Sequence, residues 1–172
     1  DFDSLSKTIS KKIKNLEKEI KRLGEKPIVT KDFPDNGKIK RLNKQFEQIN
    51  IQIILKDKNK NKIKDKTIKG IKIRFQLVKS FPSKELRSLI DQGKKDLING
   101  IVVAYSVVDN KVGIAVGVTS DLSQKYNAVK LVKLGSKVIG GTGGGGRNDF
   151  AQAGGNLPEN IEKSFQKIID SI

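Results

Sequence analysis

The chain lacks several residue types on which common kinds of protein site depend. It contains no cysteine and no histidine, which excludes disulfide bonds, a thiol nucleophile, a histidine general base and a zinc site with the usual nitrogen and sulfur ligands. Aromatic residues make up only 5% of the sequence, so the core must be built from Ile, Leu and Val. No apolar run approaches the ~20 residues that a membrane-spanning helix needs. We therefore expect a cytoplasmic protein with no membrane partner.

The length and the start of the chain also limit what it can be. Its 172 residues suffice for one ordinary domain, or for a small domain with a helical extension. The chain begins at Asp1, contains no methionine and has no basic and then apolar leader. We expect it to be a piece of a longer intracellular protein.

Lysine is what the chain has in excess. The sequence has 35 Lys and Arg against 19 Asp and Glu, a formal net charge of +16, and such a surface attracts polyanions, including nucleic acids. A genome with AT-biased codons would also enrich Lys, Ile and Asn. Charge alone therefore leaves nucleic-acid binding open.

Two amphipathic helices are predicted in the first third of the chain. Apolar residues recur at helical spacing in two stripes, which are Leu5, Ile9, Ile13, Leu16, Ile20 and Leu23, then Ile39, Leu42, Phe46, Ile49 and Ile53. Gly24 predicts the end of the first helix, and residues 24–37, which hold two glycines and two prolines, predict a connector. The pattern indicates an antiparallel, coiled-coil-like helical hairpin whose stripes pack on each other or on a second subunit.

Residues 56–66 alternate Lys with Asp and Asn and offer almost nothing to bury. We expect a hinge, a solvated helix end or a loop there. The chain is therefore divided into a helical subdomain at 1–66 and a globular subdomain at 67–172.

The apolar period changes to that of strands in the second subdomain. Ile71, Ile73, Phe75 and Leu77 alternate with polar residues, and Ile101–Val108 and Lys111–Val118 predict two strands joined by a tight turn. Helices are expected over 125–139, over 158–171, and after Ser83, the last with Leu86, Leu89, Ile90, Leu97 and Ile98 on one side. The predicted fold class is α+β: the helical hairpin, then a small α/β subdomain with a mixed sheet, helices on one face and a glycine-rich loop.

Residues 140–155 hold eight of the chain's 16 glycines. We expect packing to explain none of them, because each glycine costs about 0.5–1 kcal/mol inside a regular element. Glycines permit positive φ and the close approach of a partner to the backbone. Successive exposed N–H groups in such a run can also bind an anion.

Three common kinds of glycine-rich segment fit residues 140–155 less well. Gly141, Gly143 and Gly146 have the spacing of a dinucleotide-binding fingerprint, but that motif follows a strand and this segment follows a predicted helix. A phosphate-binding loop needs Lys-Ser or Lys-Thr where Arg147-Asn148 stands. A flexible linker would not continue into the charged and amide residues of 147–155. The segment favours a structured loop that contacts a polar, anionic surface.

The segment resembles the signature of the C-terminal domain of alanyl-tRNA synthetases, Gly-Gly-Lys-Gly-Gly-Gly-Arg-Pro-Asp leading into Ala-Gln-Ala-Gly-Gly. Thr142 replaces the usual Lys, Asn148 replaces a common Pro, and one glycine is extra. Residues 85–91 and 111–122 also resemble that domain, so the likeness covers about residues 84–155. The residues that match the signature are Arg147, Asp149, Ala151, Gln152, Ala153, Gly154 and Gly155.

The resemblance implies a tRNA-binding module without catalytic residues. In that family the full enzyme joins alanine to its tRNA with ATP and a separate domain hydrolyses mischarged tRNA, both N-terminal to this region. The resemblance implies that ATP, Mg²⁺ and Zn²⁺ belong to those other domains, which are partners of this region, and that the region itself holds no cofactor. It also implies contact with the outer corner of the L-shaped tRNA and, in some members, a homodimer.

We expect the RNA contacts on the glycine segment and on the helix before it. Three lysines of that helix, at spacings of three and four residues, would contact phosphates, although they equally suit an ordinary solvated helix face. Recognition of shape is expected rather than of bases, because the segment has one Arg and few aromatic residues. The candidate residues are Gly141, Gly143, Gly144, Gly145, Gly146, Arg147, Asp149, Gln152, Gly154, Gly155, Lys130, Lys133 and Lys137.

Two other functions remain open at this point. Similar glycine-rich domains form the substrate-binding half of DHH-type phosphoesterases, which usually carry His directly after the glycines, where this chain has Arg147. The helical stripes also suit a purely structural dimerisation module.

Overall fold

The computed structural model describes residues 2–27 and 36–172, so part of the connector predicted at 24–37 lies outside the described residues. The chain forms two compact units, Asp1–Ile53 and Ile54–Ile172. Among the described helices, none has the length and hydropathy of a membrane span.

The first unit is the predicted helical hairpin. Helix α1 (Phe2–Arg22) and helix α2 (Asn36–Lys56) bury Ile13, Ile20, Leu42 and Ile49 between them. Gly24 follows α1 with a φ of +85°, the left-handed conformation expected of a glycine that ends a helix. The outer members of the two stripes, Leu5 and Ile53, remain exposed.

The second unit is built on a mixed sheet. Its strands are β1 (Asn61–Ile68), β2 (Ile71–Lys79), β3 (Ile101–Val108), β4 (Lys111–Val118), β5 (Gly144–Gly146) and β6 (Phe150–Gly155). In the described residues they form one sheet in the order β1-β2-β3-β4-β6-β5, in which only the β2–β3 pair is parallel. The predicted α+β class with a mixed sheet is confirmed.

The prediction of a hinge, helix end or loop at 56–66 holds for the end of α2 at Lys56 and the turn at 57–60, but strand β1 corrects it for residues 61–66. β1 is an edge strand with exposed residues on both faces, so its sequence needs no apolar alternation and shows none. Its turn into β2 is made by Lys69 and Gly70, both with positive φ as a tight hairpin turn requires. β1 also runs across the predicted subdomain boundary at residue 66.

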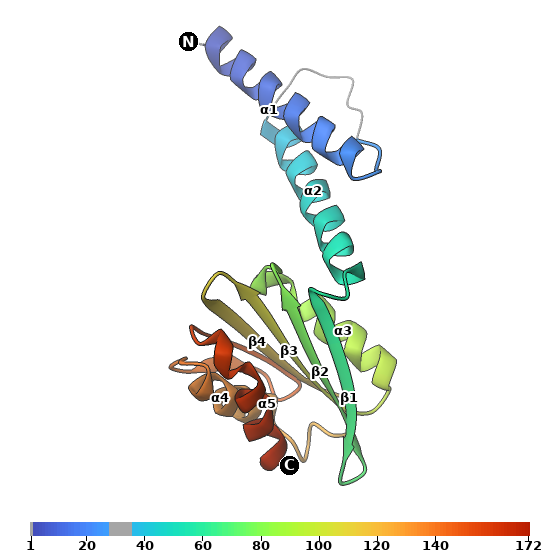
Figure 1. Ribbon diagram of the computed structural model, residues 1–172, viewed down its shortest axis with the longest axis vertical. Coiled ribbons are helices and arrows are strands. Elements are labelled where there is room, and N and C mark those ends of the chain that lie inside the picture. The colour runs from blue at the N-terminus through green and yellow to red at the C-terminus, as the bar shows by residue number, and fades with distance from the viewer. Residues whose placement is uncertain (1, 28–35) are drawn as a thin grey trace. The chain divides into compact units, whose positions relative to one another are not determined.

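Helices cover both faces of the sheet, which corrects the prediction of one covered face. Helix α3 (Leu86–Leu97) packs on one face, and α4 (Ala128–Val138) and α5 (Ile161–Asp170) pack on the other (Figure 1). Short 3₁₀ turns, η1 (Ser83–Glu85) and η2 (Pro158–Asn160), lead into α3 and α5. The covering on both faces explains why β3 and β4 are almost continuously apolar.

The end of α3 differs from the prediction at one residue. Ile98, expected on the buried side of the helix, is 75% exposed and has a φ of +67°. It lies just after the last helical residue, where its N–H still donates to the carbonyl of Lys94. Beyond the end of the helix, the spacing of 3.6 residues per turn no longer determines on which side the Ile98 side chain lies.

Candidate nucleic-acid interface

The segment predicted as a glycine-rich loop contains two short strands. β5 pairs antiparallel with β6 through Gly144–Ala153, Gly145–Gln152 and Gly146–Ala151. β6 also pairs with β4, so β5 is the edge of the sheet. Residues 147–149 form the turn between the two strands.

Packing requires five of the eight glycines, which corrects the expectation that it explains none. A Cβ on Gly141 would overlap the carbonyl oxygen of Gly154, and one on Gly155 would overlap that of Ile139. A Cβ on Gly144 would lie 2.9 Å from the Ala153 Cβ. The other two, Gly140 and Gly146, have positive φ and would also overlap neighbouring atoms.

Gly143 and Gly145 are different, because nothing in the fold requires glycine there. No atom lies within 4 Å of a Cβ built on either residue, and neither has a φ in the left-handed region. Gly154 is nearly as open, with only the Val112 carbonyl oxygen in ordinary contact at 3.4 Å. These glycines leave peptide groups bare at the surface without any benefit to packing.

Two of these three open glycines, Gly145 and Gly154, lie on one face of the sheet. Gly145 is paired with Gln152, and Phe150, Gln152 and Gly154 alternate along β6, so all four share a face. A Cβ on Gly117, the β4 partner of Phe150, would overlap Ile90 of α3, which identifies this as the α3 side. The contacts of α3 are with β3 and β4 rather than with β5 and β6. We call the uncovered part, Gly145, Phe150, Gln152 and Gly154, the open glycine face.

The opposite face of the same two strands is covered by α4. Ala151 is buried there, and Val132 of α4 lies against Gly144. Ser136 Oγ donates to the carbonyl oxygen of Gly154 at 3.0 Å. The contacts with α4 thus account for Gly144 and, through Ser136, for Gly141, whereas Gly146 is constrained by β6 and Gly140 by Asn156 and Leu157.

Two cations of α3 border the open glycine face. The Arg87 guanidinium lies 4.9 Å from the centroid of the Phe150 ring, and Lys94 Nζ donates to the carbonyl oxygen of Asp149 at 2.9 Å. The sequence did not single out either residue. Their separation of seven residues, which places both on one side of a helix, is the signal that could have found them.

The turn between β5 and β6 is held by its backbone. The carbonyl oxygen of Asn148 accepts from the Ala128 N–H, and that of Asp149 accepts from the Val118 N–H, both at 2.9 Å. The side chains of Arg147 and Asp149 form an exposed ion pair at 3.5 Å. Such exposed pairs contribute about 0–1 kcal/mol, so the guanidinium remains available to a phosphate.

The structure does not bring the predicted lysines onto the open glycine face. Lys130, Lys133 and Lys137 are exposed, while Leu131, Val132, Gly135 and Ser136 form the buried side of α4. The three lysines therefore belong to the layer on the other side of the sheet. Any phosphate that they contact is separate from one above Gly145.

No metal centre is formed in the described part of the chain. Among residues 2–27 and 36–172, no group of three or more acidic, His or Cys side chains is arranged to hold a metal ion. Arginine, lysine and backbone amides are the groups that gather around the open glycine face. These groups bind anions rather than activate a water molecule.

Comparison with known proteins gives matches to the second unit. Residues 70–172 match the family model of the DHHA1 domain. The alanine–tRNA ligases of Parvibaculum lavamentivorans and Hyphomonas neptunium are each 46% identical, over 100 and 101 residues that cover 58% and 59% of this chain and 11% and 12% of theirs. The chain thus spans about one tenth of the length of the curated relatives it matches.

A solved structure is similar to this chain in fold as well as in sequence. The crystal structure of the C-Ala domain from Aquifex aeolicus alanyl-tRNA synthetase superimposes with a TM-score of 0.59 at 27% sequence identity. The match covers 62% of this chain and 96% of that domain.

Proposed function

The chain belongs to the DHHA1 domain family, and from this membership we propose that it is the tRNA-binding C-terminal region of an alanine–tRNA ligase. The relatives bear that name, and the solved domain similar to this chain comes from an alanyl-tRNA synthetase, which confirms the resemblance predicted from the glycine segment. In this proposal the open glycine face is the contact with the RNA.

The proposed contact with the RNA is supported by two glycines that the fold itself does not require. A Cβ on Gly143 or on Gly145 would meet no atom within 4 Å, and neither residue has a φ in the left-handed region that favours glycine. Glycine in a strand weakens it, and it marks a place where another backbone or a ligand approaches closely. The bare peptide groups of an edge strand then offer donors to phosphate and ribose oxygens.

The charges near this face suit a nucleic acid. Arg87 and Arg147 lie beside it, and the chain as a whole carries +16. Glycine at two of the four positions of the open glycine face lets a large, rigid partner approach the backbone closely. The outer corner of a folded tRNA is such a partner.

Catalysis is assigned to other parts of the parent protein. We propose that aminoacylation and editing, with their ATP, Mg²⁺ and Zn²⁺, take place in domains that this chain does not contain, because the chain matches only about a tenth of its relatives. Those domains are partners of this region in the cytoplasm. The matched relatives favour this assignment over a DHH-type phosphoesterase, and the helical hairpin remains a candidate surface for a homodimer.

A titration with two RNAs tests the proposed function. The chain is titrated with a full tRNA and with a minihelix that contains only the acceptor stem and its T arm, at one fixed salt concentration. We expect at least about tenfold tighter binding of the full tRNA, since only it has the intact corner. Equal affinities would overturn the assignment to the corner, and no binding of either RNA would overturn the function.

A further inference from the structure

A row of lysines lies along β1, at the edge of the sheet opposite β5. Lys62, Lys64 and Lys66 alternate along the strand and are all exposed, so their side chains share one face. Lys66 Nζ lies 5.8 Å from the centroid of the Phe165 ring of α5, which identifies this as the α5 side. We call these three residues the β1 lysine row.

The other face of β1 has a different character. Asp65 there pairs with Arg74 at 2.9 Å, and Arg74 also pairs with Asp96 of α3 at 2.7 Å. On the α3 face of β1 the charged side chain forms an ion pair, whereas the α5 face carries the three lysines of the row. Among the described residues none of the three lysines of the row forms an ion pair, so their charges are available to a ligand.

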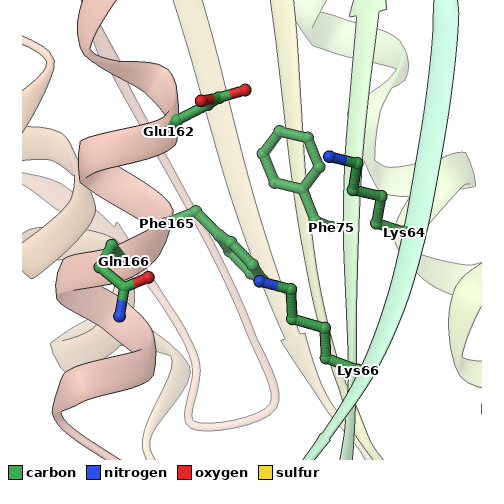
Figure 2. A pocket seen from close by; sticks show the side chains of 6 residues that line it. All are labelled: Lys64, Lys66, Phe75, Glu162, Phe165 and Gln166. Carbon is green, nitrogen blue, oxygen red and sulfur yellow. The ribbon is translucent and has the colours of Figure 1, made fainter.

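The row borders a pocket lined with aromatic rings. Figure 2 shows Lys64 and Lys66 reaching from β1 over Phe75 and Phe165, with Glu162 and Gln166 of α5 opposite. The rings of Phe75 and Phe165 are 4.9 Å apart between centroids, and the cavity measures about 170 Å³. Lysine stems that lie along apolar rings hold their ammonium groups in place, which lowers the entropy lost on binding.

The size and the lining of the pocket limit its ligand. Pockets for whole drug-sized molecules measure roughly 300–1,000 Å³, so this one accepts a single planar ring system. The Glu162 carboxylate has no hydrogen-bond or ion-pair partner among the described residues. A carboxylate accepts from exocyclic amino groups such as N4 of cytosine.

We propose that the β1 lysine row and its pocket bind a single-stranded nucleic acid. The lysines repeat about every 6.6–6.8 Å along the strand and contact successive phosphates. One base enters the pocket beside Phe75, and its amino group donates to Glu162. This site lies at the other edge and on the other face of the sheet from the open glycine face, so it does not depend on the proposed tRNA contact.

Protection of an edge strand is a simpler role for the row. Lysines on edge strands prevent pairing with a second chain, and any placement of charge on β1 would serve that purpose. The proposal additionally predicts a dependence on these three positions, on salt and on the base. The two roles therefore differ in measurable outcomes.

The test uses the whole chain and fluorescently labelled ten-nucleotide oligocytidylate, with anisotropy measured at several salt concentrations. Substitution of Lys62, Lys64 and Lys66 by Gln should weaken binding about tenfold or more and reduce the log–log salt slope by about 2, at about 0.7 per lost phosphate contact. The matched control replaces the exposed lysines Lys95, Lys111 and Lys163 by Gln and should change affinity less than about threefold. Arginine at the three β1 positions should preserve binding.

A comparison of two oligonucleotides tests the proposed contact between Glu162 and the base. Wild-type protein should bind oligocytidylate more tightly than oligouridylate, and Glu162→Gln should reduce that preference. The proposal is overturned if wild-type protein binds neither oligonucleotide, or if the two Gln triples lose affinity equally. Unchanged binding by the β1 Gln triple, with self-association in sedimentation, would assign the row to edge protection alone. If the β1 Gln triple does not fold by circular dichroism, Lys64→Glu takes its place, with an expected reduction of the salt slope by about 0.7 or more, and Lys95→Glu is its control.

Discussion

Gly145 lies directly opposite Gln152 in the register of β5 and β6, and a Cβ built on Gly145 would meet no atom within 4 Å. Its neighbour Gly144 lies opposite Ala153, where a Cβ would come within 2.9 Å of the Ala153 Cβ and 3.0 Å of Val132 Cγ1. Two adjacent glycines of one strand therefore have different roles: Gly144 allows the packing against α4, and Gly145, in our proposal, allows the approach of the RNA.

The first prediction uses that difference. Gly145→Val should leave the free energy of unfolding unchanged or raise it by about 0.4–1 kcal/mol, because the unfolded chain loses freedom and valine suits a strand. It should weaken tRNA binding about tenfold or more, because the side chain separates the backbone from the RNA. Denaturant unfolding and a tRNA titration measure the two effects.

Gly144→Val is the matched control for that variant. Its side chain must enter the contact with Ala153 and α4, and overpacking of this kind costs about 1–3 kcal/mol. If Gly145→Val binds tRNA as tightly as the wild-type protein does, the open glycine face is not part of the interface.

The second prediction concerns Arg87, which stacks on Phe150. Arg87→Gln should weaken tRNA binding and reduce the salt slope by about 1, since one phosphate contact is lost. The loss of stability should stay near the 0.5–1 kcal/mol of an exposed cation–π contact. Lys95→Gln, on the same helix, is the charge-matched control. If the two variants weaken tRNA binding equally, the net charge of the protein determines the affinity, and the position of Arg87 does not.

The third prediction concerns the lysines of α4. Lys133→Glu and Lys137→Glu together should weaken tRNA binding and flatten its salt dependence by about one unit of slope per lost contact. These lysines lie behind the sheet from the open glycine face, so their loss should add to that of Gly145→Val rather than be masked by it. Unchanged affinity after both changes would exclude α4 from the interface.

The fourth prediction concerns a buried hydroxyl pair in the core. Tyr105 Oη lies 2.8 Å from Ser164 Oγ, and Ser164 donates its own proton to the carbonyl oxygen of Gly135 at 2.8 Å. Tyr105 is therefore the donor in the pair. Burial raises the pKa of Tyr105 well above its ordinary value.

A raised pKa makes the contribution of Tyr105 to stability depend on pH. The contribution is present below the unfolded-state pKa of about 10 and is lost as the pH rises above it. Tyr105→Phe should cost about 1 kcal/mol at neutral pH, since Ser164 loses a donor, and should make the alkaline loss of stability shallower. Denaturant unfolding at pH 8 and pH 11 measures both effects. If the free energy of unfolding falls equally between these pH values in both proteins, the raised pKa of Tyr105 does not contribute to the alkaline loss of stability.

The fifth prediction concerns Asp96, whose pKa is held below its ordinary value chiefly by the hydrogen bond from Arg74 and also by that from Gln92. A lowered carboxyl pKa stabilises the fold above the unfolded-state pKa and loses that effect as the pH falls. Arg74→Gln should raise the pKa of Asp96 towards its usual range in a carboxyl-carbon NMR titration. Arg147→Gln, at the opposite edge of the sheet, should leave the pKa of Asp96 unchanged. An unmoved Asp96 after Arg74→Gln would refute the assigned cause.

The sequence predicted best where side chains carry the structural signal. The strands Ile101–Val108 and Lys111–Val118 were predicted with the bounds that the structure has, because apolar runs and a turn at Asp109 limit both ends. The hairpin core followed from the stripe spacing of α1 and α2. The resemblance rested on 147–155, whose backbone the structure shows anchored to β4, α3 and α4.

The sequence predicted worst where side chains are absent or solvated. Glycines show no alternation, so β5 could not be recognised as a strand. The two kinds of glycine could not be separated either, because the atoms that surround them come from distant parts of the sequence. β1 is an edge strand, and its lysines conceal the period that a half-buried strand would show. The seven-residue spacing of Arg87 and Lys94 indicates one side of α3, but it does not show that this side faces Phe150.

Hydrogen exchange of the whole chain, measured with and without tRNA, shows whether the RNA covers the open glycine face. We expect tRNA to slow exchange of the backbone amides over residues 143–154 and around Arg87. Protection confined to other elements, with the amides of β5 and β6 exchanging as fast as in the free protein, would contradict this expectation.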